Sequence, residues 1–318
     1  MTTALANSDG ACVSPLLDQG MRRLFEQLPR TLVGDQEAVH QMRVAGRRLR
    51  VTLSILAPKP ASRRVKRALV VLRELVQVAG RGRELDVCLE LLKARLRALG
   101  PSSPERRLLR GRLAGAVRRS RTRMADAVLD LEIARLRRDL RFVAKSGSAD
   151  ALAVCARLRE TWDALGGALV EGFGALGNRF DPEALHRLRR QARRLRYAAE
   201  VSRALTGHDS DAPAAFKDLQ ERLGAINDNY VLGDWLSKAA ARARARGAAA
   251  LAAEASSLAA WFDAQSRGHH RALLVRGPLQ IATRALGAMG GAPADSMGER
   301  PLARSRSRYA DVERSASV

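Results

Sequence analysis

Residues 40–50 of the chain read HQMRVAGRRLR, and residues 186–196 read HRLRRQARRLR. Both segments place a histidine, a leading arginine, an arginine pair, a leucine and a final arginine at the same spacing. The matched histidines are 146 positions apart, and every matched pair of arginines has the same separation. A constant separation indicates an internal duplication, and the duplicated element is a row of cations.

Each row is expected to lie along one face of a helix. At about 100° per residue, the histidine and the arginines three, seven and ten positions after it fall within an arc of about 80°. Apolar residues border the row on both sides in each copy, so we expect helices packed on both flanks, with their cations pointing into a shared basic channel. The eight side chains of the two rows are His40, Arg43, Arg47, Arg50, His186, Arg189, Arg193 and Arg196.

Unpaired arginines that converge in a channel repel one another, so such a site is expected to bind a polyanion. A solvated charged face is the simpler alternative, but it requires neither apolar borders nor an in-register duplicate. The arginines could also be structural ion-pair partners of Glu84, Asp86 or Asp228. The two histidines could be core residues paired with carboxylates, or they could contact phosphate and add charge when protonated.

Other cations are candidates to extend the site. Three of them follow the rows in the next helices: Lys66, Arg73 and Lys217. A separate row at i, i+7 and i+11 fits either the channel or the solvent, and consists of Arg112, Arg119 and Arg123.

The charge balance agrees with an acidic partner. There are 56 Lys and Arg residues against 33 Asp and Glu, which gives a net charge of +23. Such an excess attracts nucleic acid, anionic membranes or other polyphosphates, and predicts binding that weakens as salt rises. Arginine dominates both rows, and its planar fork pairs with two phosphate oxygens at once.

The composition predicts an all-α protein. Aromatic residues make up only 4% of the 318 residues, and apolar residues recur with a period of about 3.6. The three cysteines, Cys12, Cys88 and Cys155, are isolated, which favours a reducing cytoplasm over a disulfide scaffold or a cysteine zinc site. Neither a secretory segment nor an 18-residue apolar stretch is found, so we expect a cytoplasmic protein without a transmembrane segment.

Pro, Gly and Ser divide the chain into a flexible arm (1–13), two halves (about 14–147 and 148–288) and a disordered basic tail (289–318). The likeliest seam between the halves is KSGS at 145–148. Helices are expected at about 14–27, 35–57, 61–79, 84–99, 105–129, 130–144, 151–176, 182–205, 212–223, 228–246 and 248–286.

A second duplicated element follows each row. Arg73, Gly80 and Arg83-Glu84 match Lys217, Gly224 and Asn227-Asp228 at a constant separation of 144. The two halves therefore share an order of elements as well as one motif.

Taken together, these motifs resemble the CHAD domain, the conserved histidine α-helical domain. The resemblance rests on residues 40–50, on HxLR and RRLRY within residues 186–197, and on LGxxND at 223–228. It also rests on RELDV at 83–87, where Glu84 replaces the family's first Asp. It covers about residues 14–288. It implies two pseudo-symmetric four-helix bundles with a basic channel between them, and a protein that binds inorganic polyphosphate and can associate with polyphosphate granules.

Catalysis is not expected. The chain has no Gly-rich phosphate loop, no helical His-x-x-x-His pair, and only an isolated His208-Asp209 that would need further ligands to hold a metal, so neither a cofactor nor a metal site is predicted. Non-specific nucleic-acid binding through the same basic helices, or at other exposed basic surface, is the main alternative function. Against it, single-strand binders stack bases on aromatic residues, and only Tyr197 adjoins a row. An anionic membrane surface is the third candidate partner.

Overall fold

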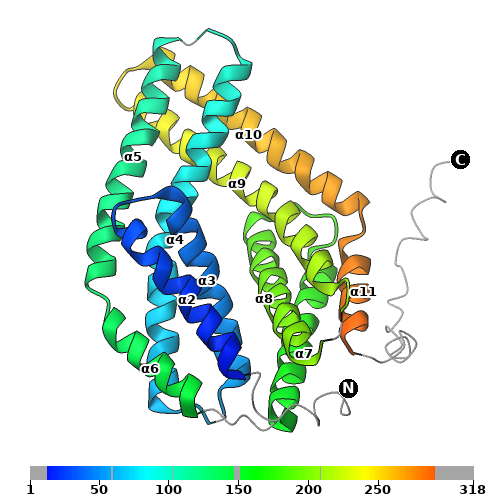
Figure 1. Ribbon diagram of the computed structural model, residues 1–318. Coiled ribbons are helices and arrows are strands. Elements are labelled where there is room, and N and C mark those ends of the chain that lie inside the picture. The colour runs from blue at the N-terminus through cyan, green and yellow to red at the C-terminus, as the bar shows by residue number, and fades with distance from the viewer. Residues whose placement is uncertain (1–12, 59, 102, 147–150, 208, 291–318) are drawn as a thin grey trace, which may run out of the picture.

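The computed structural model describes residues 13–58, 60–101, 103–146, 151–207 and 209–290. Within these ranges the chain forms ten helices and no strand, so the predicted all-α class is confirmed (Figure 1). The helices are α2 (Val13–Leu32), α3 (Gln36–Leu56), α4 (Arg63–Ala98), α5 (Pro104–Leu129), α6 (Ile133–Ser146), α7 (Ala151–Leu176), α8 (Pro182–Thr206), α9 (Ala212–Arg244), α10 (Ala249–Val275) and α11 (Pro278–Gly290).

Parts of the predicted organisation lie outside the described residues. These parts are almost all of the arm and the tail, the second half of the seam at 145–148, and His208. At the edges of the described ranges, Val13 begins α2 and residues 289 and 290 end α11, so these three residues belong to helices rather than to the arm or the tail.

The helices occur in the same order in both halves of the chain. α3 and α8 carry the two cation rows, and each is followed by a long helix, α4 with 36 residues and α9 with 33. Even the helix starts are duplicated, since Asp35 and Asp181 cap α3 and α8 and accept hydrogen bonds from backbone N–H groups of the first turn. These backbone hydrogen bonds are the main cause of the lowered pKa of both carboxyls.

Buried apolar side chains gather in three clusters. The first is formed mainly by α2, α3, α6 and the first part of α4, with the last turns of α5 and α8 and the start of α7. The second is formed mainly by α7, α8, α11 and the first part of α9, with Leu273 of α10. A third cluster is formed by the later parts of α4 and α9 together with α5 and α10, at the top of Figure 1. Each long helix therefore takes part in two clusters and ties one half of the chain to the other.

The predicted helix breaks at residues 80–82 and 224–227 are wrong, because α4 and α9 run straight through them. The glycines in these segments have no positive φ. A helical glycine costs about 1 kcal/mol relative to alanine, which packing of a long helix can offset. Gly224 and Gly82 are buried against neighbouring helices, so their lack of a side chain serves close packing rather than chain reversal.

Two other predicted boundaries also differ. The single helix expected at 248–286 is divided, because Gly277 adopts a φ of +62° and Pro278 starts a new helix. The first helix extends beyond residue 27 to Leu32, through Pro29. Burial of Leu28 and Thr31 keeps this last turn helical despite the hydrogen bond that the proline removes.

Candidate functional site

The two cation rows are held close together because α3 and α8 pack against each other. The apolar residues that border the rows are buried or partly buried, and Val51 and Val201 on one flank pack in the first apolar cluster. Met42 and Leu49 belong to the first cluster, and Leu188 and Leu195 belong to the second. Both helices are therefore fixed on their flanks, and the cationic faces are left to meet each other.

Four arginines form the centre of the site, and we call them the central arginine cluster: Arg43, Arg47, Arg189 and Arg193. Burial is the largest cause of a lowered pKa in three of them, and it lowers the pKa of Arg43 to about 9. Repulsion between the two rows is a further cause. Arg189 lowers the pKa of Arg47, and Arg47 and Arg43 lower the pKa of Arg193. The predicted convergence of the rows is thus present at this point.

Arg43 is anchored to the backbone of α4. It is only 7% exposed, and its Nη1 donates hydrogen bonds to the carbonyl oxygens of Ala79, at 2.9 Å, and Gly80, at 2.6 Å. A Cβ at Gly80 would lie 3.7 Å from this guanidinium, and a Cβ at Gly224 would lie 3.3 Å from the Nη2 of Arg189. The duplicated glycines therefore both lie against the matching arginines of the two rows, but only at Gly224 is the space too small for a side chain.

Few carboxylates accompany these cations. Asp228 lies 3.5 Å from Nη1 of Arg189, and Glu84, at the matching position of the first half, raises the pKa of the two first-half arginines of the cluster. Asp86 is paired instead with Arg121 of α5, at 2.7 Å. The buried Nε of Arg189 has no hydrogen-bond partner among the described residues. The alternative that the row arginines are structural ion-pair partners therefore applies in part to Arg189, which lies beside Asp228. Asp86 is not such a partner, because it pairs with Arg121.

The two histidines have different surroundings. The Nδ1 of His186 lies 2.7 Å from Oδ1 of Asn227, and since an amide oxygen only accepts, Nδ1 is the donor. The Asn227 amide in turn donates to Asp228. His40 has a lowered pKa because of burial first and of the nearby Arg83 second. A carboxylate does not hydrogen-bond to either ring in the part of the chain that the structure describes.

The far end of the second row is neutralised. The Nε of Arg196 lies 3.1 Å from one oxygen of Glu200, and the Nε of Arg48 lies 2.7 Å from the other. Both guanidinium groups lie beside the ring of Tyr197, at 5.4 and 5.6 Å from its centroid. Arg48 and Glu200 were not among the predicted site residues. The i, i+4 spacing of Arg196 and Glu200 was the available signal for one half of this arrangement.

Among the described residues, only one of the remaining candidate cations lies beside a row. Arg73 acts on Arg50 as a neighbouring charge, so the structure brings these two together. Lys66 and Lys217 are exposed, and Lys217 lies 3.8 Å from Glu221. The row of Arg112, Arg119 and Arg123 is on α5, which packs mainly on α4. Arg119 and Arg123 are exposed there, and Arg112 is partly buried.

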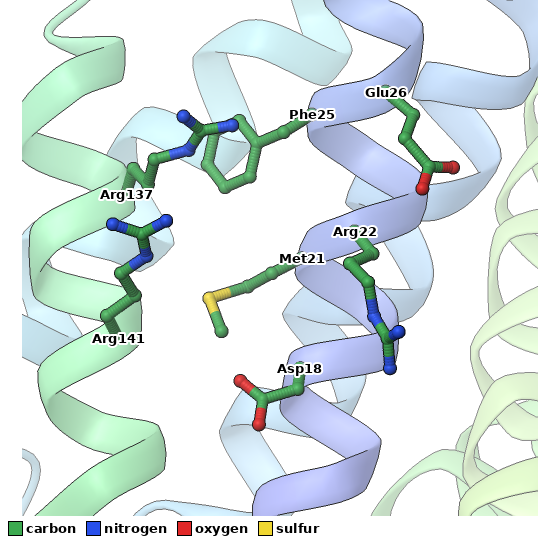
Figure 2. Close-up of a pocket in the computed structure, with 7 residues that line it drawn as sticks. All are labelled: Asp18, Met21, Arg22, Phe25, Glu26, Arg137 and Arg141. Atoms are coloured by element: carbon green, nitrogen blue, oxygen red, sulfur yellow. The ribbon is translucent and has the colours of Figure 1, made fainter.

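A separate groove of about 470 Å³ lies between α2 and α6 (Figure 2). Arg137 covers the ring of Phe25, 4.6 Å from its centroid, and Arg141 extends from the same helix. Asp18 and Glu26 also line the groove, so its charge is mixed. No residue of either cation row lines it, and it does not extend the central arginine cluster.

The sequence pattern of the CHAD domain family matches residues 16–237, which is more than half of the chain. The chain belongs to the CHAD domain family. The fold agrees, since this CHAD domain resembles the crystal structure of the CHAD domain from the plant Ricinus communis. That comparison has a TM-score of 0.57 and 23% identity, and it covers 88% of this chain and 92% of the plant chain.

Two uncharacterized proteins from Mycobacterium tuberculosis, one from strain CDC 1551 and one from strain H37Rv, are each 32% identical to this CHAD domain over 253 residues. The match covers 73% of this chain, but the chain spans only about half, 48%, of the length of these relatives. None of the described helices is both long enough and apolar enough to cross a membrane.

Proposed function

We propose that this CHAD domain binds inorganic polyphosphate along the facing cation rows of α3 and α8. In this proposal the duplicated halves act as two pseudo-symmetric four-helix bundles that enclose a basic channel. The phosphate chain lies against the central arginine cluster, and the two histidines contact it at the start of each row. The protein binds without catalysing a reaction, and in the cytoplasm it associates with polyphosphate granules.

The observation that carries the proposal is the burial of the arginines of the central arginine cluster beside one another. Arginines from both halves are partly or fully buried beside one another, and burial and mutual repulsion lower the pKa of three of them. Such an arrangement disfavours the charged form of these guanidinium groups in the free protein, and a bound polyanion would offset their mutual repulsion. We expect a thin, flexible chain with about one charge per phosphate to reach these partly buried arginines more readily than a nucleic-acid duplex, which is wider and stiffer.

Non-specific nucleic-acid binding is the second candidate, and it has its own supporting observation. Arg119 and Arg123 are exposed on α5, away from the packed rows. Exposed cations of this kind are sufficient for salt-dependent contacts with a phosphodiester backbone. Binding at this surface should not depend on the central arginine cluster.

A competition experiment separates the two functions. Labelled long-chain polyphosphate is bound to the protein and displaced by single-stranded or duplex DNA of equal total charge, and the measurement is repeated with Arg47→Met plus Arg193→Met. We expect DNA to compete weakly, and the double variant to lose most polyphosphate binding while it retains the weak DNA binding. A matched variant, Arg119→Met plus Arg123→Met, should show the opposite pattern.

Equal affinity for polyphosphate and duplex DNA, with both lost in the Arg47 and Arg193 double variant, would instead favour nucleic-acid binding by the cation rows themselves. The slope of log affinity against log salt gives an independent check, because each lost phosphate contact lowers its magnitude by roughly one.

A further inference from the structure

The final arginines of the two rows differ in their surroundings by one carboxylate. Glu200 uses both of its oxygens to join Arg48 of α3 to Arg196 of α8. All three side chains are largely buried, and Glu200 is 21% exposed. A carboxylate between two guanidinium groups occupies the place where a phosphate group would otherwise bind, so this side of the rows carries its own counter-ion.

The duplication predicts a second copy of this arrangement. At the separation of 146 residues, Arg194 of α8 matches Arg48, Arg50 of α3 matches Arg196, and Ser54 matches Glu200. Ser54 follows Arg50 by four residues, as Glu200 follows Arg196, so each lies one turn beyond its arginine. The Ser54 hydroxyl donates to the backbone carbonyl of Arg50 and supplies no charge. The second copy therefore has the arginines but lacks the carboxylate.

The cations around Arg50 have no counter-ion in the described part of the chain. Its pKa is lowered by burial and then by three neighbouring arginines, Arg73, Arg194 and Arg190, with no carboxylate acting in the other direction. The buried Nε of Arg50 has no hydrogen-bond partner among the residues that the structure describes. The pKa of Arg194 is likewise lowered by burial and by Arg190. Arg73 of α4 and Arg190 and Arg194 of α8 thus act on Arg50 of α3. These three arginines are exposed and accessible to a ligand, and the buried polar atom beside them belongs to Arg50.

We propose that Arg50, Arg73, Arg190 and Arg194 form a second phosphate-binding site, at the place that the Glu200 carboxylate fills in the other half. This inference rests on the proposed function and deepens it, since the ligand is a further phosphate group of the same polyphosphate chain. Arg190 and Arg194 join the site although neither lies on the predicted cation face. The bound chain then contacts the Arg50 side of the paired rows and avoids the Arg196 side, where Glu200 already neutralises the cations.

The test adds a carboxylate beside Arg50 and, in a separate variant, removes the carboxylate beside Arg196. Ser54 is exposed, so Ser54→Glu introduces the missing carboxylate without disturbing the core, and Ser54→Gln is a control of equal size without charge. Binding of labelled long-chain polyphosphate is measured as a function of salt for both variants, for Glu200→Gln and for the wild type. Thermal unfolding without ligand is recorded in parallel.

We expect Ser54→Glu to weaken polyphosphate binding about tenfold at low salt and to lower the magnitude of the salt slope by about one to two, because it pairs with Arg50 and Arg194. Its ligand-free melting temperature should rise, and Ser54→Gln should change neither quantity. Glu200→Gln should raise the magnitude of the slope, because it frees Arg48 and Arg196.

Two kinds of failure are distinguishable. If Ser54→Glu binds as the wild type does, while Arg47→Met plus Arg193→Met loses binding, the second site is overturned and the proposed function stands. If the wild type does not bind polyphosphate, both are overturned.

Discussion

The Nη1 atom of Arg43 donates a hydrogen bond of 2.6 Å to the carbonyl oxygen of Gly80, which joins the first cation row to the following helix. The guanidinium lies against Gly80, where a Cβ would be in ordinary contact with it at 3.7 Å. Arg43 is therefore both a member of the central arginine cluster and part of the scaffold. Arg47 and Arg193 have no ion pair or hydrogen bond of this kind among the described residues, and this difference separates the first two predictions.

Replacing Arg43 with Met should destabilise the ligand-free protein. The substitution removes two hydrogen bonds from a charged donor to the carbonyls of Ala79 and Gly80, each of which contributes about 1.5 kcal/mol or more. Relief of repulsion with neighbouring arginines offsets part of this, so we expect a net loss of about 1 to 2 kcal/mol in the free energy of unfolding. Urea denaturation measures it, and an unchanged midpoint would contradict the anchoring role.

Replacing Arg47 and Arg193 together with Met should have the opposite effect on the ligand-free protein. Both arginines are buried beside other cations, and Met keeps an aliphatic side chain while it removes the charge. The melting temperature should rise without ligand. Polyphosphate should stabilise the wild type by about 2.7 kcal/mol at a hundredfold excess over Kd, and this gain should disappear in the variant. Strong destabilisation of the ligand-free variant would mean that these arginines are structural.

Substitution of the duplicated glycines should separate helix stability from binding. Alanine in a helix is favoured over glycine by about 1 kcal/mol. At Gly80 the new Cβ would be in ordinary contact with Arg43, so Gly80→Ala should gain stability and keep its affinity for polyphosphate. At Gly224 the Cβ would lie 3.3 Å from Nη2 of Arg189 and would displace it, so Gly224→Ala should bind several-fold more weakly. Equal binding by the two variants would show that the position of Arg189 is unimportant.

Polyphosphate binding should strengthen as the pH falls from about 8 to about 6. Burial and Arg83 lower the pKa of His40 below 6.5 in the free protein, and a bound phosphate raises it again, so binding takes up a proton. Long-chain polyphosphate stays ionised over this range and is the suitable ligand. Calorimetry in buffers of different ionisation enthalpy measures the proton uptake, and His40→Gln should reduce it.

The same histidine has the opposite effect on the stability of the ligand-free protein. Because the folded-state pKa of His40 is lowered, the unfolded chain takes up the proton first as the pH falls through about 6.5. The free energy of unfolding should therefore decrease below this pH, and buried His270, whose pKa is also lowered by burial, contributes in the same direction. Denaturation of His40→Gln at several pH values isolates the His40 part.

Local patterns were sufficient to predict most of the helices and the faces of α3 and α8. The limits of this approach are clear at Gly80 and Gly224, which the sequence marks as breaks and the structure keeps within long helices. A glycine that ends a helix and a glycine that admits a neighbouring guanidinium have the same local signature. Only the packing partner, Arg43 or Arg189, distinguishes the two cases.

The sequence by itself determined the all-α class, the internal duplication and the cation rows, because helical periodicity and residue spacing are properties of a single segment. Which cations meet was decided by the tertiary structure alone, since contacts between distant helices depend on how α3, α4 and α8 pack. Packing brought Arg190 and Arg194 to Arg50, paired Arg48 with Glu200, and left Arg119 and Arg123 on α5. The two rows have equivalent sequences, and they differ in the structure because Glu200 of the second half pairs with Arg48 of the first half.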